Sequence, residues 1–200
     1  MGAHLYHKLT VRTPSTLPRT GPAILVCNHI SVIDPGIVQS ACRRPIIWMM
    51  AGEYLEIRWL QPLFSGIGVI PVARGQRDSA STRAALRALN AGRILGIFPE
   101  GRINPGTELL PFHPGAATLA DRTGVPVIPA YLDGTTRGTS MLQSALQRQE
   151  MRLRFGPPLR DKVEPRSVDG RSTYEAITAA VRSLQLSEQA QYRTERGVHR

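Results

Sequence analysis

A histidine and an aspartate lie five positions apart, as His29 and Asp34, directly after an apolar run at residues 23–26. Near neutral pH a histidine can take the proton of a hydroxyl, and a carboxylate on its other ring nitrogen fixes the tautomer and stabilises the imidazolium that forms. A substrate that brings its own hydroxyl makes a serine or cysteine nucleophile unnecessary. This spacing therefore predicts a general base and its orienting carboxylate at the end of a strand.

The same residues also fit the start of a helix. Ser31 and Asp34 have the spacing of a capping box, and Pro35 stands in the first turn of the helical run 35–42. An ideal helix would rotate residues five apart away from each other, so a contact between His29 and Asp34 requires the turn that a cap provides. Capping and catalysis are compatible, and both interpretations stay open at this point.

Three further segments each place useful side chains at a short strand. Residues 68–74 form a strand that ends in an arginine, residues 98–102 follow the apolar run 94–97, and residues 125–130 form a strand bracketed by prolines. Together with the segment that holds His29, their order and spacing resemble the four sequence blocks of the glycerolipid acyltransferases, the lysophosphatidate acyltransferase or PlsC-like family.

The resemblance runs from about residue 22 to residue 132. The first block, Asn-His-x-Ser-x-x-Asp, is matched in full. The matching residues are, block by block, Asn28, His29, Ser31 and Asp34; Gly68 and Arg74; Phe98, Pro99, Glu100 and Gly101; and Val125, Pro126 and Pro129. One block alone would be a weak signal, whereas four in the family's order are a strong one.

The resemblance implies an acyltransferase of phospholipid biosynthesis. It would move a fatty acyl group from an acyl thioester, either acyl-CoA or acyl-carrier protein, to the free hydroxyl of a lysophosphatidate-like lysophospholipid or of a glycerol phosphate. His29 would deprotonate this hydroxyl for attack on the thioester carbonyl, and Asp34 would orient His29. Transfer would be direct, in keeping with a sequence that has no Gly-x-Ser-x-Gly elbow. Neither a metal nor a cofactor beyond the thioester co-substrate is expected.

Substrate-binding roles follow from the same resemblance. The family's second and third blocks are taken to hold the acceptor's phosphate, which suits the planar fork of arginine. Arg74 carries over as a phosphate ligand. Arg102 carries over less directly, because the family usually continues Glu-Gly-Thr-Arg-Ser where residues 100–104 read Glu-Gly-Arg-Ile-Asn. A solvated charge is the alternative for Arg102. Glu100 is expected to bind the substrate by orienting the acceptor's hydroxyl, and an ion pair with an arginine is its alternative. The other substrate-binding candidates are Asn28, Ser31, Gly68, Gly101 and Pro129.

Composition limits the class of protein. A chain of 200 residues with 42% hydrophobic content can bury one substantial core. Cys27 and Cys42 show no metal-ligand spacing, and Cys27 is expected to be a buried, inert thiol at a strand end. No signal peptide and no run of about 18 apolar residues is recognisable. These features predict a cytoplasmic protein without a membrane span.

The formal net charge of +10 favours anionic partners. Anionic headgroups at the inner face of the cytoplasmic membrane, acyl-CoA phosphates and nucleic acid are attracted by the same electrostatics. A nucleic-acid-binding module should interleave exposed aromatics with clustered basic residues, whereas here the arginines are scattered and the aromatics gather at 48–64. Peripheral membrane contact therefore stays open. The alternatives to an enzyme are a non-catalytic acyl- or lipid-binding protein and, below it, a nucleic-acid-binding module.

Two apolar segments could contact lipid. Residues 48–64 hold both tryptophans, and the apolar side chains of residues 54–64 lie at helical spacing, which predicts an amphipathic helix. Such a helix packs on the core, lines a groove for the acyl chain or presses into a membrane surface. Residues 109–112, Leu-Leu-Pro-Phe, are a second candidate for lipid contact, with packing onto the core as the alternative.

Apolar runs alternate with helical patterns along the chain. Strands are expected at 23–27, 45–50, 68–72, 93–98, 125–132 and 151–155, and the clearest helices at 79–91 and 172–186. This alternation predicts a single α/β domain with a largely parallel central sheet flanked by helices. His29, Arg74 and Glu100 should meet at one sheet edge because each follows a strand. The domain is expected over 22–186, between a polar N-terminal segment at 1–21 and a fraying charged tail at 187–200.

Overall fold

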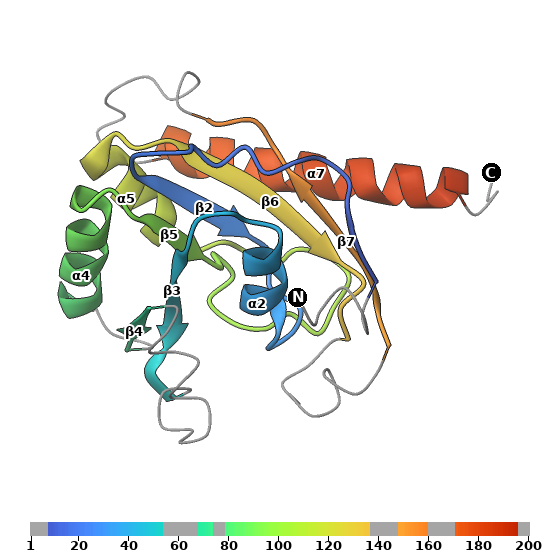
Figure 1. The fold of residues 1–200 in the computed structure, drawn as a ribbon, viewed down its shortest axis with the longest axis horizontal. Helices are drawn as coiled ribbons and strands as arrows, with labels where there is room; N and C mark the ends of the chain where they lie inside the picture. The colour runs from blue at the N-terminus through green and yellow to red at the C-terminus, as the bar shows by residue number, and fades with distance from the viewer. Residues whose placement is uncertain (1–7, 54–67, 74–78, 137–147, 160–170, 196–200) are drawn as a thin grey trace.

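A seven-stranded sheet in the order β1-β7-β6-β2-β5-β3-β4 forms the centre of the molecule (Figure 1). The computed structural model describes residues 8–53, 68–73, 79–136, 148–159 and 171–195. The strands are β1 Lys8–Val11, β2 Ala23–Cys27, β3 Ile46–Ala51, β4 Val69–Val72, β5 Ile94–Ile97, β6 Val127–Asp133 and β7 Glu150–Phe155. Neighbouring strands are parallel except β6 and β7, which are antiparallel. The predicted α/β fold with a largely parallel sheet is confirmed.

Strand β2 separates two apolar layers. Its five residues are all buried, and successive side chains of a strand point to opposite faces. Ile24 and Val26 belong to the layer that includes buried residues of α4 Ser79–Asn90, α5 Gly115–Thr123 and α7 Arg171–Glu195. Ala23, Leu25 and Cys27 belong to the opposite layer, which includes Ile37 and Val38 of the short helix α2 Asp34–Ser40. Among the helices of the described residues, α4, α5 and α7 therefore lie on one face of the sheet and α2 lies on the other (Figure 1).

The polar N-terminal segment contributes a strand to the sheet. Residues 8–11 form β1, which pairs in parallel with the edge strand β7. The chain beyond β1 stays attached to β7, because the Thr13 hydroxyl donates to the carbonyl of Phe155 and accepts from its N–H, each at 2.7 Å. The polar side chains of this segment thus supply sheet contacts that an apolarity pattern does not reveal.

The C-terminal helix is also longer than predicted. It continues to Glu195 rather than ending near residue 186, so the expected fraying tail is helical over residues 187–195. The reason is Glu188, which is 1% exposed and lies within 3.6 Å of arginines from three places in the sheet region, Arg12, Arg152 and Arg154. A sequence scan treats such a charged residue as solvent-facing, whereas here its carboxylate is buried among cations.

Parts of both candidate lipid-contact segments lie in the core, and the rest of the first segment lies outside the described residues. Trp48 lies in strand β3 and is fully buried, and the predicted helix at 54–64 lies outside the described residues. Phe112 is 6% exposed and Leu109 packs against the same apolar layer, so this part of the 109–112 segment belongs to the core. No helix in the described ranges is both long and apolar enough to cross a membrane.

Candidate active site

His29 and Asp34 contact each other in the turn between β2 and α2. The ring Nδ1 of His29 lies 3.0 Å from Oδ2 of Asp34. The side chain of His29 is 15% exposed and that of Asp34 is fully buried. A short turn closes the contact, because β2 ends at Cys27 and α2 begins at Asp34. The contact predicted from sequence is therefore present, with the carboxylate inside and the imidazole reaching the surface.

The carboxylate of Asp34 is held by backbone as well as by His29. Oδ2 also accepts hydrogen bonds from the N–H groups of Ile30 at 2.7 Å and Ser31 at 2.8 Å. These donors stabilise a buried negative charge that would otherwise be costly. The N-cap of α2 is Ile33, and no side chain caps it. The Asp34 carboxylate accepts from the Ser31 N–H, as the acidic residue of a capping box does, although α2 itself begins only at Asp34.

An aromatic stack supports the imidazole from the sheet side. The rings of His29 and Phe98 lie 4.1 Å apart with 15° between their planes, and the rings of Phe98 and Trp48 lie 4.7 Å apart with 9° between them. Gly96 leaves room for this stack, since a Cβ there would lie 2.5 Å from Cε3 of Trp48. With Asp34 fixing the ring nitrogen and Phe98 fixing the ring plane, His29 has a defined orientation.

Glu100 joins the third block to the backbone of His29. Its carboxylate is 3% exposed, and Oε1 accepts from the His29 N–H at 2.9 Å. Oε2 accepts from Nδ2 of Asn104 at 2.8 Å and from the N–H of Leu110 at 3.0 Å. The Asn104 N–H donates in turn to the His29 carbonyl at 2.7 Å. Asn104, at the position where the family usually has serine, thus completes a bridge between two blocks.

Asn28 and Cys27, the two residues directly before His29, are buried at the end of β2. The Asn28 amide donates to the carbonyl of Leu132 at 2.9 Å and accepts from its N–H at 2.8 Å, which extends the pairing of β2 with β6 beyond the strand end. Burial raises the pKa of the Cys27 thiol well above its ordinary value, and the charge of Asp34 adds to this effect. Cys27 is therefore a poor nucleophile, because a thiol whose pKa is raised stays protonated.

A hydroxyl just beyond the C-terminal end of β6 also contacts Asp34. Thr135 is 5% exposed, and its Oγ1 donates to Oδ1 of Asp34 at 3.1 Å. Gly134 makes the turn that brings it there, with φ +83° and a backbone approach that leaves no room for a Cβ. Our sequence analysis missed Thr135. The available signal was its position directly after the strand of the fourth block.

Residues 8–133 match the sequence profile of a family described as Acyltransferase. The chain belongs to the acyltransferase family. It is 27% identical over 161 residues to the 1-acyl-sn-glycerol-3-phosphate acyltransferase of Bacillus subtilis, covering 79% of this chain and 74% of that protein.

Two further comparisons agree. The acyltransferase chain is 30% identical over 130 residues to the 1-acyl-sn-glycerol-3-phosphate acyltransferase of Borreliella burgdorferi, which covers 64% of this chain and 52% of that protein. The match thus spans about half the length of that relative. The crystal structure of the 1-acyl-sn-glycerophosphate (LPA) acyltransferase PlsC from Thermotoga maritima has the same fold, with a TM-score of 0.71 at 21% identity, covering 92% of this chain and 73% of that one.

The remaining block residues of this acyltransferase occupy different environments. Gly101 has φ +67°, and a Cβ there would lie 2.7 Å from the ring of His113. Ser31 and Pro129 are buried, and Pro129 pairs with Val26 inside the sheet. Gly68, with φ +73°, precedes β4. The structure therefore gathers first-block and third-block residues around His29, and it uses Pro129 and Gly68 in the frame of the sheet.

Of the two predicted phosphate ligands, the structure describes Arg102 but not Arg74. Arg102 is exposed beside Gly101. Arg74 lies outside the described residues, so its role as a phosphate ligand stays a prediction. Within the described ranges, no group of three or more His, Cys, Asp or Glu side chains could hold a metal ion.

Proposed function

We propose that this acyltransferase moves a fatty acyl group from an acyl thioester to the free hydroxyl of a lysophosphatidate-like acceptor, with His29 as general base. The observation that carries the proposal is the 3.0 Å contact between Nδ1 of His29 and the buried carboxylate of Asp34. A carboxylate that accepts a hydrogen bond from Nδ1–H keeps the proton on Nδ1 and so leaves the lone pair on Nε2. Nε2 is then the ring atom that receives the acceptor's proton.

The reaction follows from this tautomer. Nε2 takes the hydroxyl proton as the acceptor oxygen attacks the thioester carbonyl, and Asp34 stabilises the imidazolium that forms. The tetrahedral intermediate collapses with cleavage of the carbon–sulfur bond. The leaving thiolate receives the proton from His29, which returns the base to its starting state. The stack on Phe98 keeps the ring plane fixed during both transfers.

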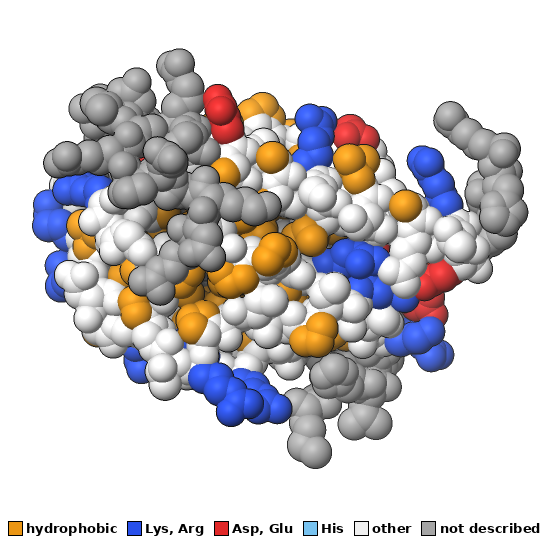
Figure 2. All heavy atoms as spheres, turned by 90° about the horizontal axis from the view of Figure 1, so that it is seen from above, with side chains coloured by type: hydrophobic (Ala, Val, Ile, Leu, Met, Phe, Trp, Pro, Cys, Tyr) orange, Lys and Arg blue, Asp and Glu red, His pale blue; other side chains and the backbone are white. Residues whose placement is uncertain are grey.

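The relatives support the choice of acceptor. Those from Bacillus subtilis and Borreliella burgdorferi are named 1-acyl-sn-glycerol-3-phosphate acyltransferases, and 1-acyl-sn-glycerol 3-phosphate carries both a free hydroxyl and a phosphate. A chain with a formal net charge of +10 suits action at an anionic membrane surface, where such a lipid resides. Figure 2 shows the Lys and Arg side chains of one face in small separate groups, which favours a lipid surface over a groove for a nucleic-acid strand.

Acyl transfer assays test the proposal. Long-chain acyl-CoA and acyl-carrier protein are supplied as donors, and the acceptors are lysophosphatidate, glycerol 3-phosphate, other lysophospholipids and lyso-aminolipids. We expect product from lysophosphatidate with the wild type and none above background with His29→Ala, while thermal unfolding shows both proteins folded. If no acceptor is acylated in the presence of lipid or detergent and the folded protein still binds acyl chains, the non-catalytic lipid-binding function replaces this one.

Arg74→Ala tests the acceptor assignment separately. Loss of an arginine fork should weaken binding of a phosphorylated acceptor far more than binding of the donor. The measurement is the KM for each substrate at saturating concentration of the other. Equal changes in both KM values would remove Arg74 from its assigned role.

A further inference from the structure

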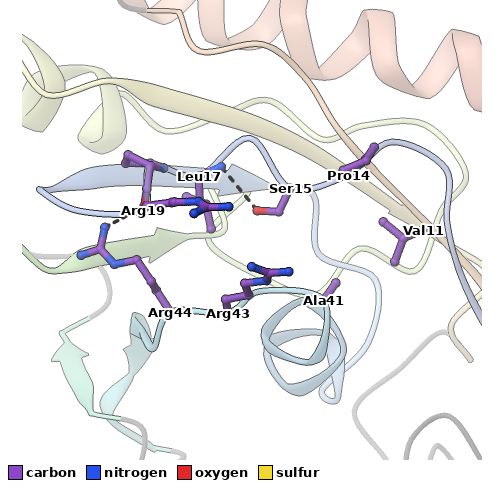
Figure 3. Close-up of a pocket in the computed structure, with 9 residues that line it drawn as sticks. Val11, Pro14, Ser15, Leu17, Arg19, Ala41, Arg43 and Arg44 are labelled. Carbon is purple, nitrogen blue, oxygen red and sulfur yellow. Dashed lines mark hydrogen bonds between the residues drawn. The ribbon is translucent and has the colours of Figure 1, made fainter.

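A pocket lies on the α2 face of the sheet, between the N-terminal segment 11–19 and the chain that follows α2 (Figure 3). Its volume is about 500 Å³. Volumes of roughly 300–1,000 Å³ are typical of small-molecule sites. Its apolar wall includes Val11, Leu17 and Ala41, and the other walls carry three arginines, Arg19, Arg43 and Arg44. Among the described elements, the seven-residue helix α2 and the extended N-terminal segment cover this face, and the pocket lies between them.

Arg44 makes one wall rigid without losing its charge. Its guanidinium donates to the carbonyls of Pro18 at 2.9 Å and Gly21 at 2.6 Å, and to that of Gly92 at 2.7 Å. These three bonds hold the N-terminal segment against the turn after α4. Carbonyl groups are neutral partners, so the positive charge of Arg44 is not compensated by a carboxylate among its hydrogen-bond partners.

Arg19 and Arg43 bring two further charges to the same space. Both side chains are exposed, and neither forms a hydrogen bond or ion pair within the described part of the chain. Figure 3 shows the two guanidinium groups pointing toward each other across the pocket. None of the described residues that line it is acidic. Converging like charges repel each other, and an anion between them would turn this repulsion into attraction.

The chemistry of the lining favours a phosphorylated nucleoside. Guanidinium forks match phosphate oxygens, and guanidinium planes and apolar side chains can cover the face of a base. The pocket is also much larger than a single phosphate requires. Its place in the fold supports the same ligand: Ala41 follows the last residue of α2 and Asp34 is the first. At a rise of about 1.5 Å per residue, the chain from Asp34 to Ala41 advances by roughly 10 Å along the helix axis. The pocket therefore lies about that far from the His29–Asp34 pair.

We propose that this pocket binds the nucleotide end of a coenzyme A thioester, whose long flexible arm then reaches from the arginines to His29. The inference rests on the proposed acyl transfer and makes acyl-CoA the donor. It assigns Arg19 and Arg43 to the donor's phosphates, which separates them from Arg74, the residue expected to hold the acceptor's phosphate.

Calorimetric titration with adenosine 3′,5′-bisphosphate, which carries the nucleotide but no thioester, tests the binding directly. The Arg19→Gln/Arg43→Gln double variant is compared with Arg83→Gln/Arg87→Gln, a pair of exposed arginines on α4 whose loss changes the net charge equally. We expect saturable binding by the wild type and by the Arg83→Gln/Arg87→Gln variant, the α4 pair. The affinity of the Arg19→Gln/Arg43→Gln variant, the pocket pair, for the bisphosphate should fall roughly tenfold, which corresponds to about 1.4 kcal/mol.

Kinetics supply a second readout. The pocket pair should raise the KM for long-chain acyl-CoA by a similar factor with little change in kcat, and should leave the KM for acyl-pantetheine, which lacks the nucleotide, unchanged. A rise in both KM values would overturn the assignment, because a nucleotide site acts only on a donor that contains the nucleotide.

Other outcomes also decide. Absence of saturable bisphosphate binding, or equal loss of binding in both double variants, overturns the proposal. If the pocket pair binds the bisphosphate normally but loses affinity for vesicles that contain phosphatidylglycerol, the pocket is a lipid-headgroup site instead. Because the titration requires no turnover, an inactive preparation would count against the proposed function and leave the binding result readable.

Discussion

The hydroxyl of Thr135 donates a hydrogen bond to Oδ1 of Asp34, and it does so from a position 101 residues further along the chain. The other carboxylate oxygen of Asp34 faces His29 and two backbone N–H groups. Thr135 therefore fixes the side of the carboxylate that the turn around His29 does not reach. Since the strand β6 ends two residues before Thr135, the sheet itself sets the position of the His29–Asp34 pair.

Replacing Thr135 by valine removes this hydrogen bond at nearly constant shape. A hydrogen bond to a charged group contributes about 1.5–3 kcal/mol, so we expect kcat to fall by roughly tenfold or more. The KM values should stay unchanged, because Thr135 acts through Asp34 rather than on a substrate. Thr135→Ser should restore most of the rate. Thr118→Val, which removes an exposed hydroxyl from α5, is the control. If the activity of Thr135→Val falls only in proportion to the amount of folded protein, with kcat of the folded fraction unchanged, then Thr135 has a purely structural role.

Asp34→Asn tests the carboxylate itself. The variant should keep the fold but lower turnover by roughly three to four orders of magnitude, by analogy with the aspartate of the serine proteases. The physical reason is that an amide can present the wrong hydrogen-bonding atom to Nδ1 and cannot stabilise an imidazolium by charge. Steady-state acyl transfer and a thermal unfolding curve are measured together. Near-normal turnover in a folded variant would leave Asp34 with a role in the turn alone.

Local patterns were sufficient to predict the strand ends that carry the site. His29 and Glu100 each follow a short buried strand, and the parallel register of β2 with β5 brings these strand ends level. In a parallel sheet such ends share one edge, so the meeting of the two residues could be predicted before any contact was known. The bond between Glu100 and the His29 N–H confirms that meeting.

Contacts made across long sequence separations could not be predicted in this way. Thr135 reaches Asp34 only because β6 lies beside β2, and a single hydroxyl after a strand carries no periodic signal. Trp48 lies in the strand predicted at 45–50, but the stacking of its ring on Phe98 depends on the pairing of β3 with β5. The burial of Glu188 likewise depends on arginines that the folded sheet brings together.

Gly96 should be intolerant of even one added methyl group. A Cβ at this position would meet Trp48 at 2.5 Å and Ile46 at 2.7 Å, so Gly96→Ala must displace the stack behind His29. Such overpacking costs about 1–3 kcal/mol. Urea unfolding should show this loss, with a lower kcat at saturating substrate. Gly36→Ala is the matched control, because nothing lies within 4 Å of its added Cβ. A helical Ala replacing Gly is expected to be neutral or stabilising by up to about 1 kcal/mol.

Glu188 should contribute to stability rather than to catalysis. Its Oε2 lies 2.7 Å from Nε of Arg154 and its Oε1 lies 3.2 Å from Nε of Arg152, in a setting that leaves the residue 1% exposed. Glu188→Gln keeps the shape but leaves the surrounding arginines without this charge. Breaking a buried ion pair from one side costs about 3–5 kcal/mol.

Urea unfolding of Glu188→Gln should therefore show a loss of that order, while the KM for the donor stays unchanged in the folded fraction. Glu175→Gln, an exposed position on the same helix, serves as the control and is expected to change the free energy of unfolding by less than about 0.5 kcal/mol. Hydrogen exchange adds a local readout: amides near the end of α7 should exchange faster in Glu188→Gln, because this carboxylate attaches the last turns of the helix to β7. Unchanged protection there would mean that the apolar contacts of α7 alone hold the helix in place.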